Sequence, residues 1–227
     1  MALVIWHPPG YPGSRGLDFF TVTLVPLLLI KIILDESVKK INKKSIRKLA
    51  RSKRNSIHRL KGLECSKDIS NIISDWIVTK RKDLIVAGYV SVNSELDLSI
   101  TFNSLCRLQT KICLPVVKNL DQPLKFKYWD TESTLIEGKF GILVPKFGKI
   151  VRPDILLCPL LSYDSKGYRL GYGGGFYDRT IEHLKNSGEI MSLGCCYSEQ
   201  LFEGDLPREE HDMPLDGIVT EKGIRFF

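Results

Sequence analysis

Three kinds of feature are missing from this chain of 227 residues, and each absence excludes a class of protein. The six cysteines form no Cys-x-x-Cys pair, and no histidine lies at finger-like spacing, so a zinc site is not expected. No uninterrupted apolar run reaches the roughly 20 residues of a membrane helix. With 43% hydrophobic and 26% charged residues, the composition is that of a globular chain and not of a disordered, collagen-like or coiled-coil one.

The longest apolar stretch, residues 19–34, is interrupted by Pro26 and Lys31. It fits neither a membrane helix nor a signal peptide, because the preceding residues are rich in proline and glycine and contain only one basic residue, Arg15. We expect residues 1–36 to be an extension outside the fold, with a membrane anchor, a targeting segment or an element packed on the domain as alternatives. Residues 37–227 are then a single domain.

The cysteines lie mostly inside apolar runs. Free cysteine is among the most buried residue types, and disulfides are rare in reducing compartments. We therefore expect buried free thiols and a cytoplasmic protein. The disulfide-bonded secreted chain is the alternative.

The positive charge is concentrated in one segment. Residues 37–63 contain eleven Lys or Arg and no acid, whereas the other 200 residues contain 22 basic and 26 acidic side chains. This distribution favours one anion-binding face over a chain that coats nucleic acid throughout.

Helical and strand-like segments alternate after this basic segment. Apolar residues at helical spacing predict helices, and short apolar or alternating runs predict strands. The predicted helices cover residues 37–61, 68–79, 95–109 and 176–186, and the predicted strands cover 84–90, 111–117, 124–129, 154–161, 189–197, 217–220 and 224–227. The pattern predicts an α/β fold with a mostly parallel sheet covered on both faces, preceded by a basic N-terminal helix.

The densest local signal is the glycine-rich segment YDSKGYRLGYGGGFYDRT, residues 163–180, which follows a predicted strand and opens a predicted helix. Closely spaced glycines let backbone N–H groups approach a ligand, and a helix N-terminus adds free donors and partial positive charge. The segment is thus typical of a phosphate cradle, in which Arg169 would clamp a phosphate and Asp178 would hold a magnesium ion.

Two familiar nucleotide-binding templates do not fit this segment. The spacing from Gly171 places Phe176 where a dinucleotide fingerprint needs glycine, and Gly175-Phe176 stands where a Walker A loop needs Gly-Lys. A tight glycine-rich turn, with Arg169 and Asp178 as a surface pair, remains the alternative.

Residues 162–179, SYDSKGYRLGYGGGFYDR, resemble the signature of the 5-formyltetrahydrofolate cyclo-ligase family. Weaker similarities follow in order along the chain: Lys43-x-x-x-Arg47, Tyr89 with Glu95-x-Asp97, KICLP at 111–115 and HDMPLDGIVTE at 211–221. The resemblance extends from about residue 38 to 224. It implies a three-layer α/β/α sandwich that uses Mg2+ and ATP to convert 5-formyltetrahydrofolate into 5,10-methenyltetrahydrofolate. It implies a monomer with small-molecule partners, and no nucleic acid or membrane.

The resemblance also assigns residues. Its catalytic residues would be Tyr177 and Arg169, its metal ligands Asp178 and Asp212, and its folate-binding residues Tyr89, Glu95, Phe140 and Tyr177. The ATP-binding residues would be Lys43, Arg47, Arg169, Gly171, Tyr172, Gly173, Gly174, Gly175, Phe176, Tyr177 and Asp178.

Each assignment has a structural alternative. Most of the eleven basic residues would lie on a solvated face, Asp212 would cap a loop, Tyr177 would be a core residue, and Glu95 would be an acid in the first turn of a helix. The chain also departs from the family at Phe176, where a tyrosine is usual, and at Val116 and Val144, where arginine and glutamate are frequent. These departures bear on folate affinity more than on the ATP site.

Two other functions remain open from the sequence. The basic segment is compatible with a non-catalytic module that binds a nucleotide or RNA, although it lacks interleaved aromatic residues for base stacking. A membrane-tethered enzyme, anchored through residues 19–34, is the third hypothesis.

Overall fold

The computed structural model describes residues 43–80 and 82–227, and the predicted extension 1–36 lies outside them. Its helices are α2 (Lys43–Val78), α3 (Ser99–Arg107) and α4 (Phe176–Asn186), with short 3-10 turns η1 (Lys139–Gly141) and η2 (Ser198–Gln200). The strands are β1 (Ile85–Ala87), β2 (Lys111–Val116), β3 (Lys125–Trp129), β4 (Leu135–Glu137), β5 (Leu143–Pro145), β6 (Ile150–Val151), β7 (Ile155–Cys158), β8 (Ser162–Tyr163), β9 (Arg169–Leu170), β10 (Met191–Cys195), β11 (Gly217–Thr220) and β12 (Gly223–Phe226).

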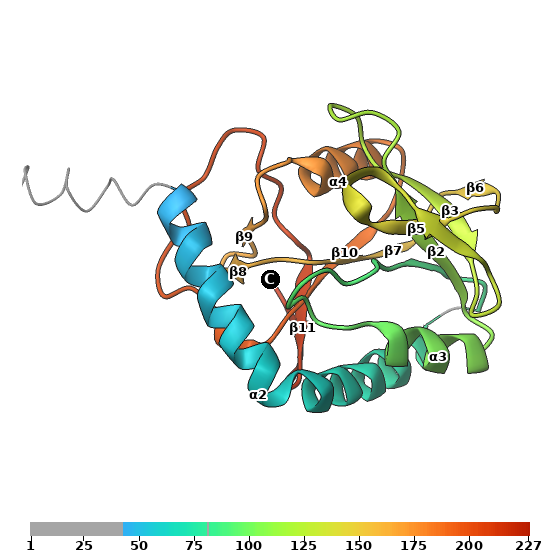
Figure 1. Cartoon of the computed structure of the whole chain (residues 1–227), viewed down its shortest axis with the longest axis horizontal. Coiled ribbons are helices and arrows are strands. Elements are labelled where there is room, and N and C mark those ends of the chain that lie inside the picture. Colours follow the sequence, from blue (N-terminus) through green and yellow to red (C-terminus); the bar gives the residue numbers. More distant parts are fainter. Residues whose placement is uncertain (1–42, 81) are drawn as a thin grey trace, which may run out of the picture. The chain divides into compact units, whose positions relative to one another are not determined.

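An eight-stranded sheet forms the centre, in the order β12-β11-β10-β7-β1-β2-β3-β6 (Figure 1). The five middle strands are parallel, with Val86 opposite Ile155 on one side and Ile112 on the other. Strand β12 at one edge, and β3 and β6 at the other end of the sheet, pair antiparallel. The predicted α/β fold with a mostly parallel sheet is confirmed.

Side chains of the middle strands alternate between two cores, as the twofold period of a strand requires. Val86, Ile112 and Leu157 pack with α2 and α3 on one face. Their chain neighbours Ala87, Cys113 and Leu156 pack with α4 on the other. The predicted three-layer α/β/α arrangement is therefore confirmed.

The structure corrects several predicted elements. The two predicted N-terminal helices are one helix, α2, because Gly62, Cys65 and Ser66 between them are buried in helical conformation. The third helix begins at Ser99, so Glu95 lies in the turn before it and the alternative role as a first-turn acid is wrong. The predicted loop 163–175 contains β9 and the end of β8, and β4, β5 and β6 were not predicted.

Among the described residues, no helix is long and apolar enough to cross a membrane. The apolar stretch 19–34 lies outside the residues searched.

Candidate active site

The order of the sheet determines where a site can form. From β1 the chain moves to β2 on one side, and from β7 it moves through α4 to β10 on the other side. Ligands of open α/β sheets bind beyond the carboxyl ends of the strands where this direction reverses. Here the direction reverses between β1 and β7, so a site is expected beyond Ala87 and Cys158, the last residues of these strands. The turn that holds Glu95 follows β1, and the glycine-rich segment follows β7.

The glycine-rich loop, residues 171–175, joins β9 to α4. Gly173 and Gly175 have φ angles of +105° and +65°, a region that other residues adopt only with strain. Gly175 is the N-cap of α4, and no side chain in the described part of the chain caps this helix. The amides of its first turn therefore remain available for an anion, as a phosphate cradle requires.

Two arginines fix this loop through its carbonyl oxygens. Arg47 on α2 donates from Nε to the Gly171 carbonyl at 3.0 Å. Arg179 donates to the Gly174 carbonyl at 2.8 Å and to the Leu120 carbonyl at 2.9 Å. The loop is thus held from α2 on one side and from the segment after β2 on the other.

Arg169 and Asp178 form a largely enclosed ion pair. Their side chains are 3% and 20% exposed, and Nη2 of Arg169 lies 2.7 Å from Oδ1 of Asp178. Arg169 also donates to the Met213 carbonyl at 2.9 Å, and the Met213 amide donates to Asp178 at 3.2 Å. The alternative of a surface pair at a simple turn is therefore wrong.

Lys43 at the start of α2 reaches the C-terminal loop. Its Nζ donates to Asp212 at 2.6 Å and lies 3.2 Å from Glu209. Burial opposes ionisation of Asp212, but the hydrogen bonds from Lys43 and the Glu209 amide hold the pKa of this carboxyl below its ordinary value. The Glu209 bond is also the loop-capping role considered as the alternative, so Asp212 serves the loop and Lys43 together.

The two acids assigned to magnesium flank Met213, since Asp178 accepts from its amide and Asp212 precedes it. Asp178 uses Oδ1 for its hydrogen bonds and Asp212 uses Oδ2, so each has one oxygen without a hydrogen bond from the described residues. Carboxylate oxygens are the ligands that magnesium prefers, so this donor set fits the ion. Asp212 also groups with Glu209 and His211, whose ligand atoms lie within 4.8 Å of one another, and Asp178 is not in that group.

On the side of β1, the turn after the strand buries Glu95 and Tyr89. Glu95 is 4% exposed and accepts from the Val92 amide at 2.9 Å. Burial raises the pKa of Glu95, against the opposing effects of the Val92 amide, Arg54 and Tyr172. Tyr89 is 3% exposed and donates its hydroxyl proton to the Leu96 carbonyl at 3.0 Å, so it supports the turn that carries Glu95.

Tyr177 lies in the first turn of α4, between the glycine-rich loop and the core on that face. Burial, with smaller effects of Cys158 and Glu95, raises the pKa of Tyr177 well above its ordinary value. Its hydroxyl therefore keeps its proton and is suited to hydrogen bonding rather than to proton abstraction.

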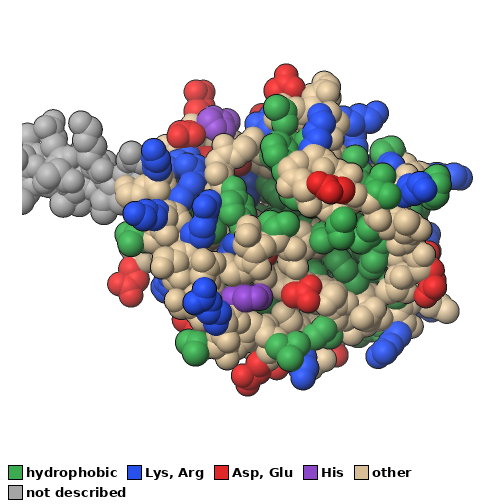
Figure 2. Space-filling view, in the orientation of Figure 1, with side chains coloured by type: hydrophobic (Ala, Val, Ile, Leu, Met, Phe, Trp, Pro, Cys, Tyr) green, Lys and Arg blue, Asp and Glu red, His purple; other side chains and the backbone are tan. Residues whose placement is uncertain are grey.

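Phe140 and Phe176 come together although 36 residues separate them in sequence. Their ring centroids are 6.0 Å apart in an edge-on arrangement, and Phe140 is 64% exposed. The hairpin of β4 and β5 presents Phe140 beside the start of α4, where the resemblance placed an aromatic residue against the folate. Figure 2 shows hydrophobic side chains gathered on the side of the molecule that holds β2, β3 and β5, and Lys and Arg along α2.

Sequence reasoning missed one residue of this region. Arg54 was grouped with the solvated basic residues, yet it is 1% exposed and lies between Glu95 and the glycine-rich loop. Its spacing from Ile46 and Ile57 was the available signal, because a charged residue on the buried stripe of a helix needs a partner inside.

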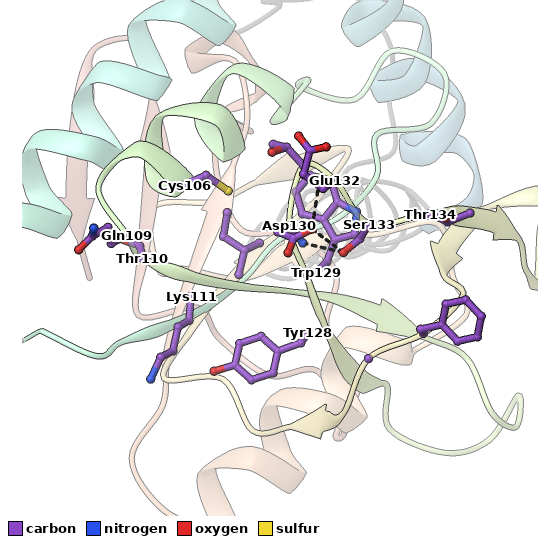
Figure 3. A pocket seen from close by; sticks show the side chains of 14 residues that line it. Cys106, Gln109, Thr110, Lys111, Tyr128, Trp129, Asp130, Glu132, Ser133 and Thr134 are labelled. Atoms are coloured by element: carbon purple, nitrogen blue, oxygen red, sulfur yellow. Dashed lines mark hydrogen bonds between the residues drawn. The ribbon is translucent and has the colours of Figure 1, made fainter.

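A pocket of about 730 Å3 lies away from the glycine-rich loop and Glu95. Lys111 begins β2 and Trp129 ends β3, and both line this pocket together with the turn in which Asp130 and Ser133 are hydrogen bonded (Figure 3). It therefore opens at the amino end of β2, opposite the carboxyl ends where the glycine-rich loop lies. None of the assigned site residues lines it.

The described fold and site define an α/β enzyme with a glycine-rich anion-binding loop at the carboxyl edge of its sheet. The model of the 5-formyltetrahydrofolate cyclo-ligase family matches residues 39–221. The chain therefore belongs to the 5-formyltetrahydrofolate cyclo-ligase family, a family of ligases.

Individual relatives agree with this membership. The 5-formyltetrahydrofolate cyclo-ligase of Escherichia coli K12 is 35% identical over 145 residues, which cover 61% of this chain and 79% of the relative. That of Haemophilus influenzae is 33% identical over 150 residues, covering 63% and 79%. The structure of Aquifex aeolicus 5,10-methenyltetrahydrofolate synthetase has a TM-score of 0.68 at 29% identity, over 81% of this chain and 92% of the other. These names do not favour the RNA-binding alternative.

Proposed function

We propose that this protein catalyses the ATP-dependent cyclisation of 5-formyltetrahydrofolate to 5,10-methenyltetrahydrofolate, with release of ADP and phosphate. The observation that supports this most is the convergence of the glycine-rich loop, Arg47 and the Arg169–Asp178 pair with the buried Glu95 beyond the ends of β1 and β7. The anion-binding half of the site, which is the glycine-rich loop with Arg47, Arg169 and Asp178, thus lies beside the carboxylate half, which is Glu95 and its turn.

The reaction has two bond changes for the protein to align. The formyl oxygen attacks the γ-phosphorus of ATP, and the bond to the ADP oxygen breaks. N10 then attacks the activated formyl carbon and loses its proton, and the C–O bond breaks to release phosphate that carries the former formyl oxygen. Amide oxygen is a poor leaving group until phosphorylated, so catalysis depends on positioning and charge stabilisation.

The anion-binding half supplies the ATP contacts. In the proposal, the amides of residues 171–175 and the start of α4 bind the phosphates, and Lys43, Arg47 and Arg169 neutralise their charge. Asp178 and Asp212 would hold Mg2+, which supplies further neutralisation of phosphate charge when bound. Tyr172 from the loop and Phe176 from the start of α4 border the nucleotide.

The carboxylate half supplies the folate contacts. Glu95 accepts hydrogen bonds from the donor-rich pterin ring, supported by the turn that Tyr89 fixes. Phe140 and Phe176 contact the aromatic part of the folate. The neutral Tyr177 hydroxyl, between the two halves, hydrogen bonds the reacting formyl group.

The decisive experiment is optical. Purified protein mixed with 5-formyltetrahydrofolate, Mg2+ and ATP should develop the near-ultraviolet absorbance of the methenyl product, with one ADP released per product. No absorbance change with folded protein would contradict the proposal. A labelled RNA titration at two salt concentrations covers the alternative, since binding through the basic helix would weaken steeply with salt.

We further propose that the enzyme is a cytoplasmic monomer whose activity resides in residues 37–227. All six cysteines are free, as is usual in a reducing compartment. Light scattering gives the oligomeric state, and cell fractionation gives the compartment. A protein that begins at Ser37 should keep the activity of the full chain.

A further inference from the structure

Arg54 is a fully enclosed charged side chain near the site. It is 1% exposed, on the same face of α2 as Ile57. Nε donates to the Ser94 hydroxyl at 3.1 Å, Nη1 donates to the Leu160 carbonyl at 3.0 Å, and Nη2 donates to the Tyr172 hydroxyl. Nη1 also lies 4.0 Å from Oε1 of Glu95.

These partners belong to two separate segments of the chain. Ser94 and Glu95 lie in the turn after β1, whereas Leu160 lies in the segment after β7 and Tyr172 lies in the glycine-rich loop. The guanidinium is therefore the point at which one side chain contacts both halves of the proposed site. Its planar fork suits this, because it directs several donors along fixed directions.

Stability alone does not account for a charge at this position. Removing a guanidinium from water is costly, and apolar residues of similar volume often replace buried ion pairs without loss of stability. Among the described residues, Arg47 on the same helix hydrogen bonds the Gly171 carbonyl of the loop, and Arg51 lies over the ring of Tyr172, at 5.4 Å. Arg54 contacts the loop and Glu95 together.

We propose that Arg54 is a positioning residue that couples the ATP-binding loop to the folate-binding carboxylate. It holds Glu95 in the turn after β1 and fixes the glycine-rich loop through the Tyr172 hydroxyl. The folate-binding side and the ATP-binding side of the site therefore keep their geometry together. The inference rests on the proposed function, because it assigns ATP and folate to these two halves.

The proposal has a consequence for the pH profile. The groups that face Glu95 are Arg54 from α2, Tyr172 from the loop, Tyr89 from the turn after β1 and Tyr177 from α4. Arg54 is the cation among them. Burial already raises the pKa of Glu95, and loss of Arg54 raises it further, so a larger fraction of Glu95 is neutral at a given pH. The acidic limb of kcat/KM for the folate should then move to higher pH.

The test uses full-length variants with matched controls. Arg54→Met removes the charge and the donors at similar length, Arg54→Lys keeps only the charge, and Tyr172→Phe removes one hydroxyl. Lys53→Met is the control, since it removes one positive charge from an exposed neighbour on α2. We expect Arg54→Met to lower kcat/KM for both substrates about tenfold or more, through KM for each. Lys53→Met should match the wild type.

The remaining variants separate coupling from folding. Arg54→Lys should keep the acidic limb near its wild-type position but still raise both KM values. Tyr172→Phe should raise KM for ATP more than KM for the folate. Because part of the effect of the Tyr172 hydroxyl is exerted through Arg54, the double variant Arg54→Met, Tyr172→Phe should lose less than the sum of the two single variants.

Additive effects in the double variant, or wild-type KM values and pH profile in both Arg54 variants, would overturn the coupling. If Arg54→Met does not fold, Arg54→Lys and Tyr172→Phe decide, with thermal unfolding as the check. If the wild type forms no methenyl product, the proposed function fails. Direct titration then tests Arg54, with tenfold weaker binding of ATP by Arg54→Lys expected and unchanged binding as the contrary result.

Discussion

Asp178 is the residue on which the anion-binding half depends, because Arg169 and the Met213 amide both donate to its Oδ1. Asp178→Asn keeps the size and removes the charge. We expect the rate of methenyl formation to fall at least about 100-fold, since Arg169 and the proposed metal lose their carboxylate. We expect unfolding free energy to fall by about 2 kcal/mol, below the range for fully buried pairs because Asp178 is 20% exposed. Initial rates and thermal unfolding measure both.

The control for Asp178 is another aspartate in an ion pair. Asp205 lies 2.7 Å from Lys166, and both side chains are more than half exposed. Asp205→Asn should leave the rate of methenyl formation unchanged. A wild-type rate in Asp178→Asn would remove Asp178 from the mechanism.

How far the site could be predicted differs from residue to residue. Arg47 contacts the glycine-rich loop, Arg169 and Asp178 pair beside it, and Lys43 reaches Asp212 in the C-terminal loop. These residues could be named from the sequence because each lies in a contiguous family motif, and their roles stay predictions. Arg54 belongs to no such segment. Its partners lie 40 and 118 residues away, and only the folded sheet brings them to one place.

Among the elements, the glycine-rich loop has the most restricted backbone. At Gly173 the φ angle is +105°, and a Cβ there would lie 3.3 Å from Cζ of Arg47. Gly173→Ala should lower unfolding free energy by about 1 kcal/mol through the backbone. It should also raise KM for ATP by a larger factor than a loss of about 1 kcal/mol in binding would give, because the loop shifts away from Arg47. ATP titration and thermal unfolding measure the two effects.

A glycine outside the site separates these causes. Gly204 has a φ angle of +96°, and a Cβ there would meet nothing within 4 Å. Gly204→Ala should show the backbone cost with an unchanged KM for ATP. Equal KM values in the two alanine variants would contradict the role of the loop geometry.

A second prediction at this scale concerns the contact between α2 and the C-terminal loop. The depressed pKa of Asp212 means that its ionised form stabilises the folded state. This contribution is complete above the ordinary aspartate pKa of 3.8 and is lost as the pH falls through the lower folded value. Lys43→Met should therefore lower Tm near neutral pH, and the difference from wild type should shrink below pH 3.8. A difference that does not change with pH would exclude this ion pair as its cause.

The helices and strands show why sequence patterns predicted some elements and not others. Helix α4 begins and ends as its apolar spacing predicts, because its amphipathic pattern is short and complete. The break predicted within α2 is absent, since Cys65 and Ser66 are small enough to pack inside a continuous helix. Strands β8 and β9 have two residues each, which is too short for an alternating apolar pattern to be seen in the sequence.

At the scale of the whole molecule, the two cores share a feature that can be measured. Cys65 and Cys195 lie in the core under α2 and α3, and Cys113, Cys158 and Cys196 in the core under α4. Burial raises the pKa of each of these five thiols, with Cys65 at about 11 and Cys158 at about 12. Thiolate is the reactive form, so the five should react only when the cores open.

An aromatic disulfide reagent tests this opening. In the native protein we expect one fast thiol, the half-buried Cys106, and five that react at the rate set by unfolding of the domain. Cys106→Ser should abolish the fast phase and keep the enzymatic rate, because Cys106 lies at the pocket beside β2 and not at the glycine-rich loop. In denaturant all six should react. A second fast thiol from one core would show that this layer opens separately, whereas a common slow rate means that both cores unfold as one unit.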